Sequence, residues 1–211
     1  TKAPVFYSAT TQPIEVEIEF SGQIVRVEVL NQSVYTNVSV TKRGYKQVTP
    51  SQTIRYDFKN IANNSTVPLN SFYWRDTLPV RLTKIITGTW NQKLSYKVVY
   101  KTNLHDYRTL ADNLSTMKNY SLDASPAALG LASNEYVTDF MFVFGTVKAG
   151  FAQVDAPYIL CWTNSWLNNG YQFANRTDVG GLHGGQWIMA TDRWVTTVYK
   201  PGVTTLPKTG Y

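Results

Sequence analysis

Hydrophobic and polar residues alternate along much of the chain with a period of two, which is typical of half-buried β-strands. The clearest alternation is in residues 14–20 and 23–29, which flank the turn-forming pair Ser21-Gly22. This arrangement predicts a β-hairpin. Further strands are expected where β-branched and aromatic residues are enriched. These segments are 38–42, 53–59, 72–78, 93–101, 136–147, 158–163 and 187–199.

Two segments depart from this alternation. Apolar residues in 106–131 fall near helical spacing, so one or two short helices are expected there, crossing one end of the domain. The residues with this spacing are Tyr107, Leu110, Leu114 and Met117, and Ala127, Ala128 and Leu129 follow Pro126 in the same segment. The glycine-rich segment 180–185 lacks the Lys-Ser/Thr pair of a phosphate-binding loop and predicts a long hairpin loop. The expected fold is all-β: an immunoglobulin-like or adhesin β-sandwich with a short helical insertion, preceded by a β-hairpin.

Composition and charge exclude several classes of protein. The 211 residues are 43% hydrophobic and 14% aromatic, which excludes a disordered or collagen-like chain. The longest apolar run, 140–144, is far shorter than the roughly 20 residues that cross a bilayer, so no membrane insertion is expected. The net charge of +6 is scattered along the chain rather than gathered in a stripe, so nucleic acid is not an expected partner.

The single cysteine, Cys161, rules out a disulfide within the chain. Cysteine and histidine do not occur at zinc-binding spacing, so neither a metal nor another cofactor is expected. His105 and His183 belong to no recognisable catalytic motif. Cys161 lies in a predicted strand, where an inert core thiol is expected. The chain is therefore not expected to be an enzyme that acts on an external substrate, and any covalent cross-link must use other side chains.

Three polar residues occupy positions that the strand alternation assigns to the buried face. They are Lys42, Asp76 and Asn175, and each continues a row of apolar residues two positions apart. The rows are Val38 and Val40, then Phe72, Trp74 and Leu78, and finally Tyr171 and Phe173. Taken singly, each polar residue has an ordinary explanation. The lysine can extend its ammonium group to water, the aspartate can cap a turn, and the asparagine can bind a loop backbone.

Taken together, the three residues form a reactive set. An isolated buried lysine or aspartate costs several kcal/mol, so each must be paired, neutralised or chemically consumed. Burial lowers the pKa of a lysine and raises that of an aspartate, which favours a neutral amine beside a protonated carboxyl group. The amine of Lys42 can then attack the carboxamide of Asn175, while Asp76 polarises the oxygen and helps ammonia to leave. The product is an intramolecular isopeptide cross-link, with Asp76 as the catalytic residue.

Five short segments strengthen this hypothesis. They are Val-Ser-Val-Thr-Lys (38–42), Thr-Pro-Ser-Gln-Thr-Ile-Arg-Tyr (49–56), Ile-Ala-Asn-Asn-Ser (61–65), Asp-Thr-Leu-Pro (76–79) and Phe-Ala-Asn-Arg-Thr-Asp-Val (173–179). Together they resemble the conserved-repeat, collagen-adhesin A-type domains of Gram-positive surface adhesins and pilins. The resemblance covers residues 36–200, with 106–131 as an insertion. It implies that Lys42 donates the amine, Asn175 accepts it and Asp76 is the catalytic carboxyl group.

The last residues of the chain match the sortase sorting motif Leu-Pro-x-Thr-Gly. The motif is formed by Leu206, Pro207, Lys208, Thr209 and Gly210. Proline enforces a bend, and the small glycine leaves the threonine carbonyl open to a cysteine nucleophile. The motif implies an extracellular, cell-wall-anchored protein whose partners are sortase and either cell-wall peptidoglycan or pilin subunits. We expect this chain to be part of a longer protein.

The expected organisation has three parts. Residues 1–35 hold the hairpin, which resembles the end of a prealbumin-like B-type repeat with Asn31 at the acceptor position. Alternatively, the hairpin is an added edge of the sheet. Residues 36–200 form the sandwich with the candidate isopeptide bond, and 201–211 form a linker with the sorting motif. The predicted function is that of a structural or adhesive module of a bacterial surface protein or pilin.

Two alternatives remain open. The first is a secreted β-sandwich module without a cross-link that binds carbohydrate or peptide, such as a host glycan or matrix protein, through exposed aromatic residues. The candidate aromatics are Tyr107, Tyr120, Trp162, Trp166 and Trp194. The second is a secreted glycoprotein, because Asn-x-Ser/Thr sequons recur and one of them begins at Asn175. A glycan on Asn175 would exclude the isopeptide bond there.

Overall fold

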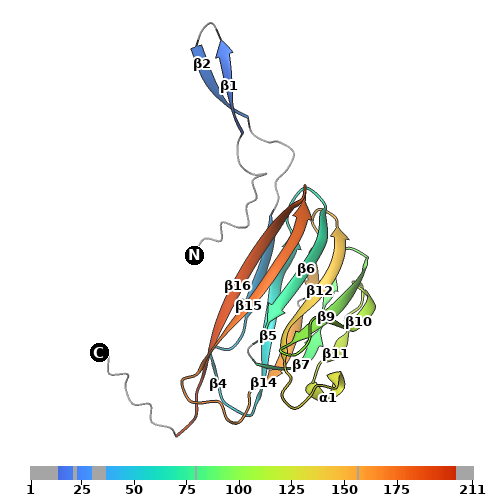
Figure 1. Ribbon diagram of the computed structural model, residues 1–211, viewed down its shortest axis with the longest axis vertical. Helices are drawn as coiled ribbons and strands as arrows, with labels where there is room; N and C mark the ends of the chain where they lie inside the picture. The colour runs from blue at the N-terminus through green and yellow to red at the C-terminus, as the bar shows by residue number, and fades with distance from the viewer. Residues whose placement is uncertain (1–13, 21–22, 30–36, 79, 156, 203–211) are drawn as a thin grey trace, which may run out of the picture.

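The computed structural model describes the backbone of residues 14–20 and 23–29, and residues 37–78, 80–155 and 157–202 in full. The described chain is almost entirely β-structure, and two sheets pack face to face (Figure 1). The expected all-β sandwich is therefore confirmed. The predicted hairpin is also present, as an antiparallel pair formed by β1 (Ile14–Phe20) and β2 (Gln23–Val29).

The larger sheet has seven strands and the smaller one five. In spatial order the larger sheet contains β10 (Arg108–Ser115), β9 (Ser95–Thr102), β12 (Val137–Val147), β6 (Leu69–Thr77), β15 (Gln172–His183), β16 (Gln186–Val198) and β4 (Gln47–Val48). The smaller sheet contains β11 (Ser121–Asp123), β7 (Arg81–Ile86), β14 (Tyr158–Trp162), β5 (Thr53–Asn63) and β3 (Val38–Arg43). Neighbouring strands are antiparallel except for β16 and β4, which are parallel.

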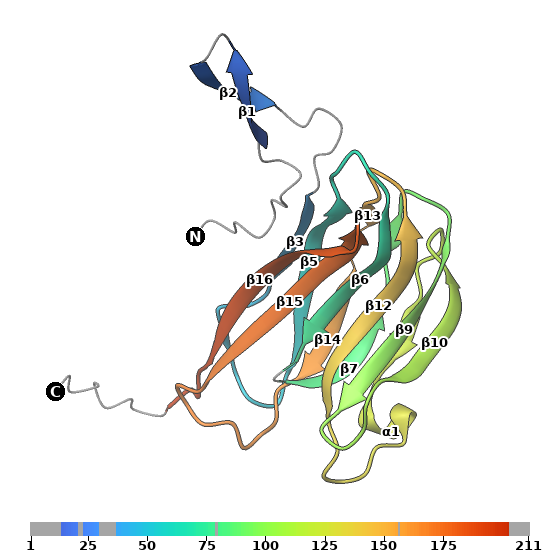
Figure 2. The same ribbon diagram turned by 45° about the horizontal axis from the view of Figure 1, so that its top comes forward.

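A short pair of strands and one short helix complete the described structure. The pair is β8 (Thr89–Trp90) with β13 (Gln153–Asp155), and the helix is α1 (Pro126–Leu129). Ser125 caps the helix by accepting a hydrogen bond from the Ala128 backbone N–H, and Gly130 ends it in the left-handed conformation. The helix lies at one end of the sandwich (Figure 2).

Aromatic side chains fill the space between the sheets. Trp74 of β6 is fully buried and meets Phe58 of β5 edge-on, with ring centroids 4.6 Å apart. Phe140 and Phe142 of β12 contact the same indole. These residues alternate with half-buried or exposed ones along their strands, so the period of two distinguishes the core face from the outer face. Edge-to-face pairs of this kind add about 0.5–1.5 kcal/mol each to the free energy of burial.

Along one side of the sandwich the sheets approach each other closely. Strand β3, at the edge of the smaller sheet, lies against β15 and β16 of the larger one. The backbone N–H of Lys42 donates to Asp192 Oδ2 at 2.8 Å, and the indole N–H of Trp194 donates to the Tyr45 carbonyl at 3.0 Å. The side chains of β3 and β15 that face inward therefore share one compartment of the core.

The expectation of a short helical insertion in 106–131 is confirmed by α1, but the near-helical spacing of Tyr107, Leu110, Leu114 and Met117 does not form a helix. Only α1 is helical, whereas the residues with near-helical spacing lie in and around β10, which pairs with β9. The register shifts twice along this pair, and Asn113 has a φ of 52°. Such bulges insert extra residues into a strand, so its inward positions no longer recur every second residue. Because of these bulges, the apolar residues of β10 are spaced like those of a helix although they belong to a strand.

The loop expected at 180–185 is also shorter than predicted. Gly180 and Gly181 lie inside β15, and only Gly184 and Gly185 form the turn between β15 and β16. A Cβ atom at Gly180 would come within 2.9 Å of the Tyr73 ring, and one at Gly181 within 2.9 Å of Leu69. The two strand glycines therefore permit close packing rather than forming a loop.

Candidate functional site

The three polar residues singled out by their alternation all face the core. Lys42, Asp76 and Asn175 have no solvent-exposed surface. They come from β3, β6 and β15, so both sheets contribute to the cluster. The predicted inward orientation is confirmed for all three. One detail differs, because Tyr171 precedes β15 and is half exposed, so the buried row in that strand begins at Phe173.

Lys42 and Asp76 are in direct contact. The Nζ atom of Lys42 lies 2.7 Å from Asp76 Oδ1, and this contact joins the two sheets through the core. Desolvation raises the pKa of Asp76 to about 6, and the nearby Lys42 partly opposes this rise. The carboxyl group is therefore much easier to protonate than a surface aspartate.

Aromatic rings isolate this pair from water. Lys42 Nζ lies 4.8 Å from the centroid of the Tyr56 ring and 5.3 Å from that of Phe58. Both rings belong to β5, and both are buried. An apolar enclosure disfavours a charged carboxyl group, which is the cause of the raised pKa of Asp76.

Asn175 is a diagonal neighbour of Asp76 on the adjacent strand. In the β6–β15 ladder Asp76 is opposite Thr177, and Asn175 lies two residues before Thr177 on the same face. Diagonal neighbours in a sheet are close enough for their side chains to interact. The amide Nδ2 of Asn175 donates to the Tyr56 hydroxyl at 2.9 Å. Lysine, carboxyl group and amide therefore form one buried cluster, together with Tyr56.

Two acceptor atoms in this cluster lack hydrogen-bond partners among the described residues. They are Asp76 Oδ2 and Asn175 Oδ1, and both are fully enclosed. An unsatisfied buried acceptor costs about 1–3 kcal/mol. A proton on Asp76 can remove this cost, because a neutral carboxyl group donates where a carboxylate only accepts. The cluster thus holds a nucleophile, a proton donor and an acyl group.

Tyr56 and Thr196 also belong to the site, although the pattern of the sequence did not single them out. The Tyr56 hydroxyl lies 3.1 Å from Thr196 Oγ1, and both side chains are buried. A signal for Tyr56 was present, because it shares the inward face of its strand with Ile54 and Phe58. Thr196 carried no comparable signal, since threonine is common on both faces of a strand.

The remaining chemical candidates do not join this cluster as reactive groups. Cys161 is fully buried in β14, and desolvation raises its pKa, so the thiol stays protonated. No group of three or more His, Cys, Asp or Glu side chains suited to a metal occurs in the described part of the chain. Within the same residues, no helix is long and apolar enough to span a membrane. Asn31 and the motif 206–210 lie outside the described residues.

A separate groove lies at the α1 end of the sandwich. Its volume is about 940 Å³, and its lining includes Arg81, Leu131, Asn134, Glu135, Tyr136 and Trp166. Trp166 is 72% exposed and Tyr136 59% exposed. The other candidate aromatics do not line it: for example, Trp194 packs near Arg43, and Tyr120 accepts a hydrogen bond from the Ser115 backbone. Of the five aromatics proposed for a ligand groove, Trp166 alone is placed there.

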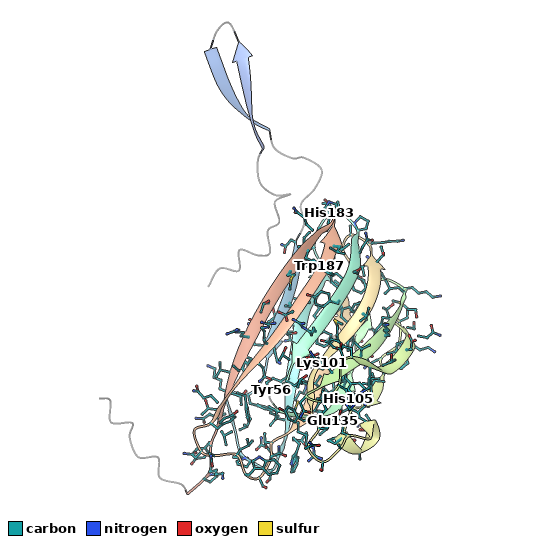
Figure 3. All side chains as sticks on the ribbon, in the orientation of Figure 1. Tyr56, Lys101, His105, Glu135, His183 and Trp187 are labelled. Carbon is teal, nitrogen blue, oxygen red and sulfur yellow. The ribbon has the colours of Figure 1, made fainter. Side chains whose placement is uncertain are left out.

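Glu135 fixes the wall of this groove. Its carboxylate accepts hydrogen bonds from Thr102 Oγ1 at 2.7 Å, from Arg108 at 2.9 Å and from the Ala132 backbone at 3.2 Å. His105 Nδ1 lies 2.7 Å away, and the two residues lie close together near α1 in Figure 3. The hydrogen bonds from Thr102 and His105 are the main reason that the pKa of Glu135 is lowered to about 2.

This lowered pKa predicts an acid-sensitive groove wall. A depressed carboxyl pKa contributes stability above the unfolded value of 4.5, and the contribution disappears as the pH falls towards 2. Glu135→Gln imitates the protonated side chain. We expect wild type to melt at a higher temperature than Glu135→Gln above about pH 5, and the gap to shrink by about pH 3. A gap that is constant across this range would contradict the assignment.

Comparison with known proteins adds little to this description. No family model matches the chain, and no curated protein matches it. Among solved structures, the chain is similar to one described as "AvmM Catalyzes Macrocyclization in Alchivemycin A Biosynthesis". The identity is 11% and the TM-score 0.35, over 90% of this chain and 98% of the other. A likeness of this strength supports no argument about function.

Proposed function

We propose that this chain is a structural or adhesive module of a cell-wall-anchored bacterial surface protein or pilin, stabilised by an autocatalytic isopeptide bond between Lys42 and Asn175. The observation that carries the proposal is the buried contact of Lys42 with Asp76, beside an amide whose oxygen has no hydrogen-bond partner among the described residues. A buried ion pair is a poor source of stability by itself. A reaction of Lys42 with the amide of Asn175, assisted by Asp76, would explain why three side chains whose burial is energetically unfavourable lie in one compartment of the core.

The reaction can proceed with the groups present. A proton first passes from Lys42 to Asp76, across the 2.7 Å contact. The neutral amine attacks Cγ of Asn175, and the carbonyl electron pair moves to Oδ1, which takes the proton of Asp76. The Asp76 carboxylate then removes a proton from Nζ. The tetrahedral intermediate then breaks down. Asp76 donates a proton to Nδ2, so that ammonia leaves, and it takes the proton from Oδ1 as the carbonyl group forms again. Asp76 is protonated at the end of the reaction.

The position of the bond suits a protein that bears load. It would join β3, near the start of the sandwich, to β15, near its end, and so connect the two sheets covalently. In the unfolded chain the bond would close a loop of more than 100 residues, which in the chain-entropy model stabilises the fold by about 4–5 kcal/mol. Unlike a disulfide, it would resist reduction.

Intact mass measures the proposed reaction. Purified wild type should be lighter than its sequence by one ammonia molecule, whereas Asp76→Ala should have the full sequence mass. Asp57→Ala is a suitable control, because Asp57 forms an exposed ion pair with Arg55 in β5. Full mass in wild type would refute the bond, and a loss of ammonia in Asp76→Ala would refute the role of Asp76.

The sorting motif carries the proposal of extracellular anchoring. Residues 206–210 match the substrate of sortase, whose partners on the wall would be peptidoglycan or pilin subunits. We expect sortase and an oligoglycine nucleophile to replace Gly210-Tyr211, leaving Thr209 joined to glycine in a mass spectrum. The variant Leu206→Ala should remain uncleaved. A wild-type chain that is not processed under these conditions would contradict anchoring by this motif.

The groove at α1 favours a second candidate function, the binding of a carbohydrate or peptide ligand. Its two exposed aromatic rings lie beside polar side chains of Arg81 and Asn134, a combination common in ligand sites. We expect Trp166→Ala to weaken binding to ligands found on glycan and matrix-peptide arrays by about tenfold or more, with the melting temperature unchanged. Trp187→Ala, which removes an exposed tryptophan at the other end of the sandwich, is the control (Figure 3). Equal binding by both variants would exclude the groove.

A further inference from the structure

A chain of hydrogen bonds leads from the reactive amide to the backbone of the loop after β3. Asn175 Nδ2 donates to the Tyr56 hydroxyl at 2.9 Å, and that hydroxyl lies 3.1 Å from Thr196 Oγ1. Thr196 Oγ1 in turn donates to the Tyr45 carbonyl at 2.8 Å. The side chains of Asn175, Tyr56 and Thr196 are all buried. The amide is therefore held by a connected polar network.

The end of this network fixes its direction. The Tyr45 carbonyl can only accept, so the single hydroxyl proton of Thr196 is committed to it. The Thr196 hydroxyl oxygen must then accept a hydrogen bond from Tyr56, and the Tyr56 hydroxyl proton is used in that hydrogen bond. The Tyr56 oxygen is left to accept, so Asn175 must present its NH₂ group and not its carbonyl oxygen. Burial raises the pKa of Tyr56 to about 12, so this donor keeps its proton at ordinary pH.

The direction of the network determines how the amide faces the lysine and aspartate. With Nδ2 committed to Tyr56, Oδ1 points away from Tyr56, and it has no partner in the described chain. Within the described residues, Asp76 Oδ2 also lacks a partner, and Asp76 is the diagonal neighbour of Asn175. A flipped amide would place its NH₂ group where the proton donor must act, and it would leave two acceptors facing each other at Tyr56.

We propose that Tyr56 is a catalytic residue of the isopeptide reaction, which holds the departing nitrogen of Asn175 and, backed by Thr196, keeps the carboxamide oriented for attack by Lys42. This inference rests on the proposed function. The covalent step is unchanged: the Nζ–Cγ bond forms, the Cγ–Nδ2 bond breaks, and one proton passes from Nζ to the leaving ammonia. Tyr56 and Thr196 retain their protons throughout, so their contribution is orientation.

Timed intact mass after cell-free synthesis tests this inference. Tyr56→Phe keeps the ring beside Lys42 but removes the hydroxyl, and we expect ammonia loss to be slower than in wild type by about fivefold or more. Tyr96→Phe is the matched control, because Tyr96 is buried in the same core on β9. It should react at the wild-type rate. Wild-type kinetics in Tyr56→Phe would overturn the proposal.

Substitutions at Thr196 distinguish an orienting role of the hydroxyl group from a role in packing alone. Thr196→Ser keeps the hydroxyl and should retain the wild-type rate, whereas Thr196→Val keeps the shape and should be slowed. The double variant Tyr56→Phe with Thr196→Val should be no slower than Tyr56→Phe alone, because both changes break one network. Equal rates for serine and valine, or additive effects in the double variant, would contradict the network.

The outcomes separate this inference from the proposed function. If wild type never loses ammonia, the isopeptide bond itself is refuted, and the role of Tyr56 falls with it. If wild type reacts and the hydroxyl-deleting variants react equally fast, the bond stands and the orienting role is wrong. If a folded Tyr56→Phe reacts slowly while Thr196→Ser reacts normally, both are supported.

Discussion

Asp76→Ala is expected to be the most destabilising single substitution in the buried cluster. It removes the proton donor, so the bond should not form, and it leaves Lys42 in the core without its partner at 2.7 Å. Breaking a buried pair by removing one member costs about 3–5 kcal/mol. The absent cross-link should add a further loss of about 4–5 kcal/mol. Chemical denaturation should therefore show a large fall in the free energy of unfolding, or no folded protein at all.

The surface aspartate gives the comparison for this result. Asp57→Ala breaks an ion pair with Arg55 whose side chains are partly exposed. Such pairs contribute about 0–1 kcal/mol, so the variant should unfold close to wild type. If Asp76→Ala were as stable as Asp57→Ala, neither the buried contact nor the bond would matter to the fold.

Asn175→Ala is expected to produce the second-largest effect, and it removes the cross-link without removing either member of the buried ion pair. The Lys42–Asp76 pair remains intact, but no acyl group is available, so the protein should have no bond. A loss of about 4–5 kcal/mol corresponds to a fall in melting temperature of about 10–20 °C for a domain of this size. Scanning calorimetry of the two proteins measures the difference.

Asn168→Ala is the matched control for this variant, because Asn168 is an exposed loop residue. It should melt within a few degrees of wild type. A melting temperature of Asn175→Ala that matches this control would mean that the side chain closes no covalent loop. The sequon at Asn175 is a poor glycan acceptor in the folded protein, because a fully buried Asn175 offers no surface to a glycan.

The sequence predicted the parts of the fold in which the pattern reports on burial. Strands such as β5, β6 and β12 were expected because β-branched and aromatic residues are enriched in them. In the structure, buried residues recur at every second position along much of each strand. The same rule placed Lys42, Asp76 and Asn175 inside. It needed no knowledge of which strands are neighbours.

The features of the fold and site that the sequence did not predict depend on packing between strands, which the residue pattern of one strand does not show. Bulges in β10 displaced its inward residues and produced a false helical spacing. Gly180 and Gly181 resembled a loop, although their role is to admit the side chains of Tyr73 and Leu69. Tyr56 and Thr196 belong to the site because β5 and β16 meet across the core. This contact depends on the tertiary structure and leaves no pattern in either strand alone.

Peptide mapping by tandem mass spectrometry tests the central claim most directly. After digestion of the wild-type protein with trypsin, we predict one branched peptide in which the Nζ atom of Lys42 is bonded to Cγ of Asn175, with one ammonia lost and no cleavage after Lys42. The linear peptides that contain these two residues should be absent. Recovery of both linear peptides, with Lys42 and Asn175 unmodified, would contradict the account.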